Sequence, residues 1–225
     1  MIYVKDLSKT YNLGHGNEYK ALKNISMTIN NGEFVSIIGK SGAGKSTLLH
    51  VLSGLDSFEE GIVKIDKHDL RDMSDAELSH MRSELIGIIL QDYALLDDFT
   101  VYENVMLPLS FSKVAYTFRK QYVTEALSKV GILELSKKRV SELSGGQKQR
   151  VAISRGIVNH PQYLFADEPT GSLDSKTSND IMRLFHKLNQ EGITIIFITH
   201  NMELAMSGDR LIKLEDGILA KEEYI

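Results

Sequence analysis

Apolar and polar residues alternate along the first part of the chain, from Met1 to about Thr28. A period of two is typical of strands that bury one face, so this part is predicted to be antiparallel β-structure. Asn31-Gly32 lies between two apolar runs and predicts a hairpin turn. Asp216-Gly217 predicts a second hairpin, because it separates Leu211–Leu214 from Ile218–Ala220. Both ends of the chain are therefore expected to contain antiparallel strands.

Three short runs are almost entirely apolar, namely Phe34–Ile38, Tyr163–Ala166 and Ile193–Thr199. Continuous apolar runs of this length are typical of strands that are buried on both faces of a parallel sheet. Apolar stripes with helical spacing predict helices at Lys45–Leu55 and Asp174–Gln190. Because strands and helices alternate, the core is predicted to be an α/β fold built on a mainly parallel sheet.

The middle of the chain is predicted to be mainly helical, from about residue 92 to residue 159. Before it, Ser74-Asp-Ala-Glu77 is a capping box that opens a helix. Within it, a helical stripe that ends at Gly131 consists of Phe118, Tyr122, Val123, Leu127 and Val130. We interpret residues 1–225 as a single domain with two approximate lobes. Residues 1–91 and 160–225 form the core with its antiparallel β subdomain, and residues 92–159 form a helical subdomain.

Composition narrows the possible partners. The formal net charge is −4 and no segment concentrates basic residues, so no nucleic-acid partner is expected. The chain has no cysteine, which excludes a disulfide partner and thiolate metal sites. No apolar run approaches the roughly 18 residues that span a bilayer, and the N-terminus lacks a secretory signal pattern. We expect a cytoplasmic location, with any membrane role supplied through another chain.

A phosphate-binding loop is predicted at Gly39–Ser46, which matches G-x-x-x-x-G-K-[ST] between a buried strand and a helix. Glycines let consecutive backbone N–H groups point inward, and the helix N-terminus adds partial positive charge beside a phosphate. Lys45 should bridge the β- and γ-phosphates, Ser46 should bind Mg²⁺, and Thr47 can reach the α-phosphate. The predicted nucleotide-binding residues here are Gly39, Ser41, Gly42, Ala43, Gly44, Lys45, Ser46 and Thr47.

Two carboxylates, Asp167 and Glu168, follow an apolar strand, whose end should reach the edge of the sheet where ligands bind. Asp167 is expected to hold Mg²⁺, and Glu168 to accept a hydrogen bond from the attacking water. His200 follows the last apolar run, so it should reach the same edge and contact the γ-phosphate. The remaining histidines are interpreted as surface or packing residues: His15, His50, His68, His80, His160 and His186.

A second phosphate-binding helix end is predicted at Leu143–Gln147, whose sequence Leu-Ser-Gly-Gly-Gln precedes an amphipathic helix. Ser144 is a natural helix cap, and the glycines behind it expose backbone N–H groups to an anion. With this motif the sequence resembles the ATP-binding cassette family, from Tyr3 to Leu219. In that family, Ser144 and Gly146 would contact the γ-phosphate of an ATP held by the opposite subunit, and Gly145 and Gln147 would belong to the same nucleotide-binding segment. The resemblance therefore implies a head-to-tail homodimer with two ATPs at its interface.

The resemblance also assigns weaker markers. Tyr11 would lie under adenine, although on its residues alone it could equally be an ordinary strand aromatic. Gln91 would sense Mg²⁺ and water, although Leu90 before it replaces a common phenylalanine, which concerns packing. Asp174, in the loop that starts at Ser172, would approach the nucleotide across the dimer. We call Leu143–Gln147 the signature segment and the helix that it starts the signature helix. In that helix, Gly156 stands where alanine is common and is expected to cost about 1 kcal/mol of helix propensity.

Thr100–Leu109 and Ala166–Asp174 look most like the macrolide-exporter and lipoprotein-release branch, which also includes antimicrobial-peptide resistance and cell-division members. This likeness implies an ATPase on the inner face of the cell membrane that powers a separate permease, for export or extraction of a peptide, lipoprotein or hydrophobic drug. A cell-division regulator without transport remains an alternative. The family holds a permease helix near Gln91–Pro108, although Phe99, Val101 and Tyr102 could equally be core.

Overall fold

The computed structural model describes residues 1–12, 14 and 16–225, which divide into two compact units. The first unit comprises Met1–Ser79 and Thr194–Ile225, and the second comprises His80–Ile193. Helix α2 (Asp75–Leu85) crosses this boundary along the chain. The predicted lobes, with residues 92–159 as a helical subdomain, stay a prediction.

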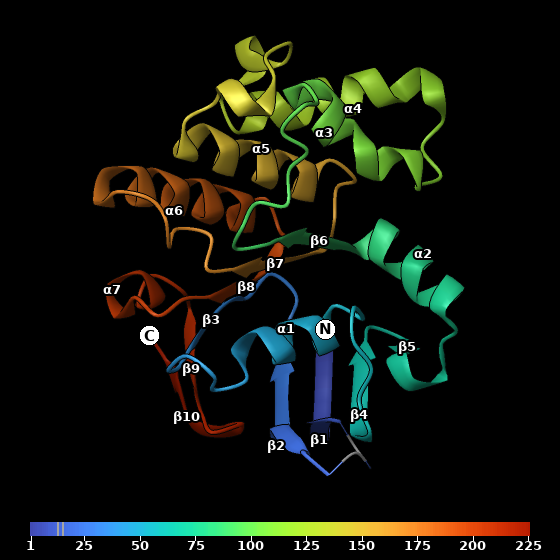
Figure 1. Cartoon of the computed structure of the whole chain (residues 1–225), viewed down its shortest axis with the longest axis vertical. Coiled ribbons are helices and arrows are strands. Elements are labelled where there is room, and N and C mark those ends of the chain that lie inside the picture. Colours follow the sequence, from blue (N-terminus) through green and yellow to red (C-terminus); the bar gives the residue numbers. More distant parts are fainter. Residues whose placement is uncertain (13, 15) are drawn as a thin grey trace. The chain divides into compact units, whose positions relative to one another are not determined.

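The first unit contains an antiparallel sheet with the strand order β2-β1-β4-β5, drawn in blue and teal in Figure 1. Its strands are β1 (Ile2–Tyr11), β2 (Tyr19–Ile29), β4 (Glu60–Ile65) and β5 (His68–Asp69). Ile2 pairs with Ile29 on one side and with Ile65 on the other, and all three side chains are fully buried. The antiparallel structure predicted for the start of the chain is therefore confirmed.

The same unit contains a parallel arrangement in which β3 (Phe34–Ile38) lies between β8 (Thr194–Ile198) and β9 (Arg210–Glu215). Every residue of β3 and β8 is buried, as their apolar sequences predict. Strand β10 (Ile218–Tyr224) pairs antiparallel with β9 through a turn in which Asp216 and Gly217 both have positive φ. The short helices η1 (Leu70–Asp72) and α7 (Met202–Ala205) complete the unit.

The hairpin predicted at Asn31-Gly32 is wrong, although the chain does turn there. Gly32 has a φ of 77°, and the Glu33 amide donates to the Asn30 carbonyl at 3.3 Å. However, β2 pairs with β1, whereas β3 pairs with β8 and β9. The turn signal specifies a local reversal only. An all-apolar strand such as β3 is buried best in the centre of a sheet, so its partners come from distant segments.

Helix α1 spans Lys45–Leu52 and is shorter than the predicted Lys45–Leu55. The chain leaves the helix at Ser53, and Gly54 then adopts a φ of 68°. Leu55, which continues the apolar stripe in the sequence, is consequently 49% exposed. A left-handed glycine after a helix is a common stop signal, and here it outweighs the periodicity.

The second unit contains the parallel pair β6 (Ile86–Ile89) and β7 (Tyr163–Asp167) together with most of the helices. The predicted helical character of residues 92–159 is confirmed (Figure 1). The second unit contains the helices α3 (Val101–Met106), η2 (Leu107–Ser110), α4 (Tyr116–Lys129), η3 (Leu133–Leu135), η4 (Val140–Glu142), α5 (Gly145–Ile157) and α6 (Ser175–Gln190). Helix α5 contacts α3, α4 and β6, which makes it the central element of the unit.

Local signals in the helical region are mostly confirmed. The Ser74 amide and the Glu77 carboxylate form the predicted capping box, with a donor–acceptor distance of 2.8 Å. Gly131 adopts a φ of 73° just after α4, and Leu127 on the predicted stripe is fully buried. Phe118 is an exception at 56% exposed, because it lies in the first turn of α4, before the buried residues of that helix, which begin at Val123.

Gly156 has a packing role that its low helix propensity conceals. A Cβ atom on Gly87 of β6 would lie 2.1 Å from the Gly156 carbonyl oxygen. A Cβ atom on Gly156 would itself lie 3.3 Å from the Leu164 side chain. The two glycines therefore let α5 pack closely on the strands of its unit, which offsets the propensity cost.

Candidate functional site

The loop between β3 and α1 follows the path that its glycines predict. Gly44 caps α1 with a φ of 97°, and a Cβ there would lie 2.6 Å from the Ala21 carbonyl oxygen. A Cβ on Gly39 would lie 2.4 Å from the Leu214 carbonyl oxygen. The Gly217 amide donates to the Ala43 carbonyl at 3.1 Å. Backbone from three other segments thus touches this loop, and only glycine fits at two of its positions.

Lys45 and Tyr19 both contact the loop with their side chains. The Lys45 ammonium donates to the carbonyls of Gly39 at 2.8 Å and Lys40 at 3.0 Å, so its side chain folds back onto its own loop. The Tyr19 hydroxyl donates to the Gly42 carbonyl at 3.0 Å. Tyr19 was not predicted as a site residue. It belongs to no sequence motif, and its contact with the loop depends on the register of β2.

Tyr11, at the end of β1, belongs to a polar network. Its hydroxyl donates to Asp56 at 2.8 Å, and the Lys9 ammonium lies 4.9 Å from the centre of its ring. Lys9 is buried and forms ion pairs with Asp56 at 3.1 Å and Glu59 at 3.4 Å. Burial raises the pKa of Tyr11, a hydrogen bond with Thr47 opposes that shift, and Asp56 adds to it. This network orients an aromatic ring beside α1 and was not predicted.

His200 lies where the strand pattern predicts. The Thr199 amide, just after β8, donates to the carbonyl of Ile37 near the end of β3 at 3.2 Å. His200 follows directly and is exposed. It therefore stands at the carboxyl edge of the sheet from which the Gly39 loop also starts. Of the other histidines, His160 packs edge-on against Tyr122, whereas His15 lies outside the described residues.

In the second unit, the parallel pairing of β6 and β7 brings Gln91 and the two carboxylates to one edge. Asp167 ends β7 at 6% exposed, and its Oδ1 is buried without a hydrogen-bond partner among the described residues. Glu168 has a φ of 46°. Left-handed backbone at a non-glycine residue costs of order 1 kcal/mol or more and is concentrated at functional sites. Gln91 is exposed beside this edge.

The signature segment forms a complete, self-capped helix start. The Ser144 side chain caps α5, and its amide donates to the Gln147 side chain at 3.0 Å. Both Ser144 and Gly145 are exposed. A Cβ on Gly146 would lie 2.7 Å from the Thr177 methyl group of α6. The helix end is therefore accessible on the surface of its unit, with little room for a side chain at Gly146.

Asp174 caps α6 beside this helix. Its carboxylate accepts from the Thr177 amide at 2.9 Å and the Thr177 hydroxyl at 2.6 Å. These hydrogen bonds lower the pKa of Asp174. The second unit thus brings Asp174, Gly146 and Gly145 into one neighbourhood. The sequence motifs gave no indication that Thr177 joins them.

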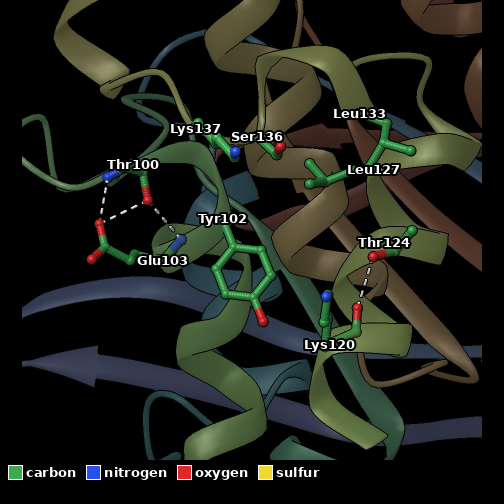
Figure 2. Close-up of a pocket in the computed structure, with 9 residues that line it drawn as sticks. All are labelled: Thr100, Tyr102, Glu103, Lys120, Thr124, Leu127, Leu133, Ser136 and Lys137. Carbon is green, nitrogen blue, oxygen red and sulfur yellow. Dashed lines mark hydrogen bonds between the residues drawn. The ribbon is translucent and has the colours of Figure 1, made fainter.

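Residues 99–102, which the sequence left undecided between core and contact surface, separate in the structure. Val101 is fully buried, whereas Phe99 is 43% exposed. Tyr102 forms a wall of an open cavity of about 410 Å³ between α3, α4 and η3 (Figure 2). The cavity is lined by Thr100, Tyr102, Glu103, Lys120, Thr124, Leu127, Leu133, Ser136 and Lys137.

No helix among the described residues is both long enough and apolar enough to span a membrane. Residues 22–171 match the model of the ABC transporter family. The chain is 43% identical over 223 residues to the uncharacterized ABC transporter ATP-binding protein YvrO of Bacillus subtilis, covering 99% of this chain and 97% of the relative. It is also 43% identical to the macrolide export ATP-binding/permease protein MacB of Bdellovibrio bacteriovorus, of which it covers only 34%.

Two solved structures of the ABC transporter cassette MJ0796 of Methanocaldococcus jannaschii resemble this chain. The dimeric cassette has a TM-score of 0.91 at 42% identity, covering 100% of this chain and 98% of that one. A post-hydrolysis dimer bound to ADP and Pi has the same TM-score at 41% identity, covering 100% of this chain and 98% of that one. This likeness confirms the predicted α/β fold with its mainly parallel sheet, antiparallel β subdomain and helices. The chain belongs to the ABC transporter family and is one of its ATP-binding ATPase domains.

Proposed function

We propose that two copies of this chain assemble head to tail and enclose two ATP molecules, each held by the Gly39–Ser46 loop of one copy and the Ser144 end of α5 from the other. The observation that carries this proposal is the accessibility of the second helix end. Ser144 and Gly145 are exposed at the start of a 13-residue helix, whose N-terminal dipole attracts anions. Closure would depend on the γ-phosphate, because ADP lacks the group that links Lys45 to Ser144.

Mg²⁺ fits the donor set that this assignment requires. The described residues contain no cluster of three His, Cys, Asp or Glu side chains that could hold a metal alone. Mg²⁺ usually binds through one or two protein oxygens plus substrate phosphates and water, so such a cluster is not needed. The unpartnered, buried Oδ1 of Asp167 supports its assignment as a metal-binding carboxylate. Ser46 and Gln91 would supply the other protein oxygens.

Hydrolysis is assigned to residues at the carboxyl edges of the strands. Glu168 would accept a hydrogen bond from the attacking water, and His200 would contact the γ-phosphate. Lys45 would exchange its present carbonyl contacts for phosphate oxygens, which are stronger acceptors because they are charged. Tyr11, oriented by Asp56, would stack on the adenine ring.

The membrane partner is the second part of the proposal. ATP turnover would drive a separate permease for export or extraction of a peptide, lipoprotein or hydrophobic drug, at the inner face of the cell membrane. The similarity to a macrolide export ATP-binding/permease protein supports a membrane partner.

The cavity in Figure 2 is the proposed contact for that permease. Glu103 uses its carboxylate to cap α3, through Thr100 N at 2.8 Å and Thr100 Oγ1 at 2.7 Å, and these hydrogen bonds lower its pKa. Lys120 and Lys137 have no carboxylate within ion-pair distance in the part of the chain that the structure describes. An aromatic wall with two unpaired ammonium groups fits a permease segment that carries an apolar side chain next to an acidic one.

The Glu168→Gln variant tests the dimer. It should bind ATP without hydrolysing it, so its mass with ATP and Mg²⁺ should double relative to ADP. Glu134→Gln, an exposed position on η3, is the matched control and should hydrolyse ATP and return to monomer. A Glu168→Gln variant that stays monomeric while saturated with ATP would contradict the proposal.

A charge-reversal pair tests the cavity. Lys137→Glu should weaken binding of this chain to a candidate permease, reconstituted in vesicles, by about tenfold. Lys138→Glu, at the neighbouring exposed position outside the cavity, controls for net charge. Equal losses in both variants would refute the cavity as the contact.

A further inference from the structure

Arg155, in the last turn of α5, holds the loop that follows Gln91. Its guanidinium donates to the Tyr93 carbonyl at 2.6 Å and to the neighbouring Ala94 carbonyl. Both of these loop residues have left-handed backbone, with φ of 58° and 48°. Two successive left-handed non-glycine residues are unfavourable by themselves, so a fixed pair of donors is needed to stabilise them.

The same turn connects to the loop before α6. The Tyr93 hydroxyl lies 2.6 Å from the Ser172 hydroxyl, two residues before Asp174. Downstream, the fully buried Asn104 side chain accepts from the Leu96 amide at 2.8 Å and donates to the Leu96 carbonyl at 3.0 Å. The loop is therefore anchored at its left-handed turn and again just downstream of it, which leaves it little freedom to absorb a displacement.

We propose that Arg155 and Tyr93 are positioning residues for ATP hydrolysis. Through them, a movement of α5, which starts at Ser144, shifts the loop of Gln91 and the loop of Asp174 together. When the Ser144 end of α5 docks on a nucleotide in the opposite copy, the movement of α5 would thus position Gln91 and the loop of Asp174 in the same protomer. This inference rests on the proposed function, because it uses the roles assigned there to Gln91, Asp174 and the α5 end.

Arginine suits this position better than lysine does. Burial lowers the pKa of the Arg155 guanidinium, yet arginine stays protonated under all physiological conditions. Its planar fork can donate to two adjacent carbonyls at once, whereas a lysine ammonium cannot reproduce that geometry. Replacement by lysine therefore keeps the charge but loosens the turn.

A matched pair of variants tests Arg155. Arg155→Lys should lower kcat by about tenfold with little change in KM for ATP. Arg150→Lys on the same helix is the control, because Arg150 also donates to a backbone carbonyl, that of Val130 at 2.6 Å, but does not touch the loop of Gln91. Its kcat should stay within about twofold of wild type. Equal losses of kcat in both variants, or a loss fully explained by lower melting temperature, would overturn the proposal.

A double-mutant cycle tests Tyr93 without removing buried charge. Tyr93→Phe and Ser172→Ala should each lower kcat by about fivefold, and the double variant should lose no more than either single one, because both remove the same hydrogen bond. Multiplicative losses would contradict a shared link, and so would unchanged kcat in all three. The Glu168→Gln dimer assay separates the two hypotheses. If the Glu168→Gln dimer forms with ATP but the double-mutant cycle gives multiplicative losses or no loss of kcat, only the inference about Arg155 and Tyr93 is wrong.

Discussion

The two glycine-rich helix starts differ in how they are held. The start of α1 has no side-chain cap, since Gly44 occupies the cap position, and its loop is enclosed by backbone at Ala21 and Leu214. The start of α5 is capped by its own Ser144 and Gln147 and stays exposed. The first end is thus shaped by its own unit, whereas the second is complete by itself and open to another molecule.

This difference shows that glycine serves two purposes in one chain. At Gly44 it permits positive φ and a close approach of backbone, which no other residue tolerates. At Gly145 the φ is not positive and a Cβ would meet nothing closer than 3.6 Å, so the absence of a side chain matters for access to the helix end. Substitutions should therefore damage folding and nucleotide affinity at the first end, and dimerisation at the second.

The largest expected effect is at the enclosed end. Gly44→Ala would place Cβ 2.6 Å from the Ala21 carbonyl oxygen at a φ of 97°, so ATP affinity should fall by about 100-fold or more and the unfolding free energy by about 2–3 kcal/mol. Gly32→Ala is the control, because Gly32 has a positive φ of 77° and open space around its Cβ but lies outside the loop. Titration calorimetry and thermal melting measure both. Similar damage from the two variants would show that the close approach is unimportant.

A large effect is also expected at the exposed end, but on assembly. Gly146→Ala would bring Cβ within 2.7 Å of the Thr177 methyl group. The variant should therefore form about tenfold less dimer with ATP, and its kcat should fall by about the same factor. The monomer should still bind nucleotide normally. Thr177→Ser removes that methyl group and keeps the hydroxyl that donates to Asp174. The double variant should recover most activity, and a failure to recover would mean that Gly146 acts through backbone contacts alone.

A moderate effect is expected from the cap. Ser144→Ala removes the side-chain acceptor at the start of α5 and should lower the unfolding free energy by about 1 kcal/mol. It should weaken the ATP-bound dimer more than the fold, because the proposed γ-phosphate contact is lost as well. Denaturant unfolding and analytical ultracentrifugation separate the two quantities. A variant that loses stability yet dimerises like wild type would limit Ser144 to capping.

The smallest effect concerns pH and the network around Tyr11. Burial alone would raise the pKa of Asp56, but hydrogen bonds from Tyr11 and Lys9 outweigh it and lower the pKa below its usual value. A depressed folded-state pKa contributes stability above the unfolded-state pKa, near 4, and this contribution is lost as pH falls through the folded value. The unfolding free energies of wild type and Asp56→Asn, measured as a function of pH, should therefore converge below about pH 4, and wild type should be the more stable protein above that pH. Parallel curves would contradict the predicted sign.

Sequence reasoning worked where one local pattern decides the outcome. The loop at Gly39–Ser46, the capping boxes and the Asp216-Gly217 hairpin depend on neighbouring residues, and the structure has them as predicted. It failed at Asn31-Gly32 and Leu55, where strand pairing and a left-handed stop override the pattern. At Asn31-Gly32, the partners of the flanking strands come from residues far away along the chain.

The site followed the same division. A strand end predicted that His200 would share an edge with the loop. The role of Gln91 was implied only by the family resemblance, and the pairing of β6 with β7 places Gln91 at the same edge as Asp167. Contacts between segments were invisible in the sequence. Neither Tyr19 on Gly42 nor Arg155 on Tyr93 belongs to a motif, because each depends on strand register or on helix orientation.

Cross-linking of two differently labelled copies tests the head-to-tail dimer most directly, and the natural chain offers no cysteine to interfere. One copy carries Lys40→Cys and the other Ser141→Cys, at exposed positions beside the two helix ends but outside the proposed nucleotide contacts, both in the Glu168→Gln background, with a cross-linker of about 8 Å. The account predicts cross-linked heterodimers only when ATP and Mg²⁺ are present and the two copies are mixed. Cross-links that form equally with ADP, or none at all with ATP bound, would contradict it.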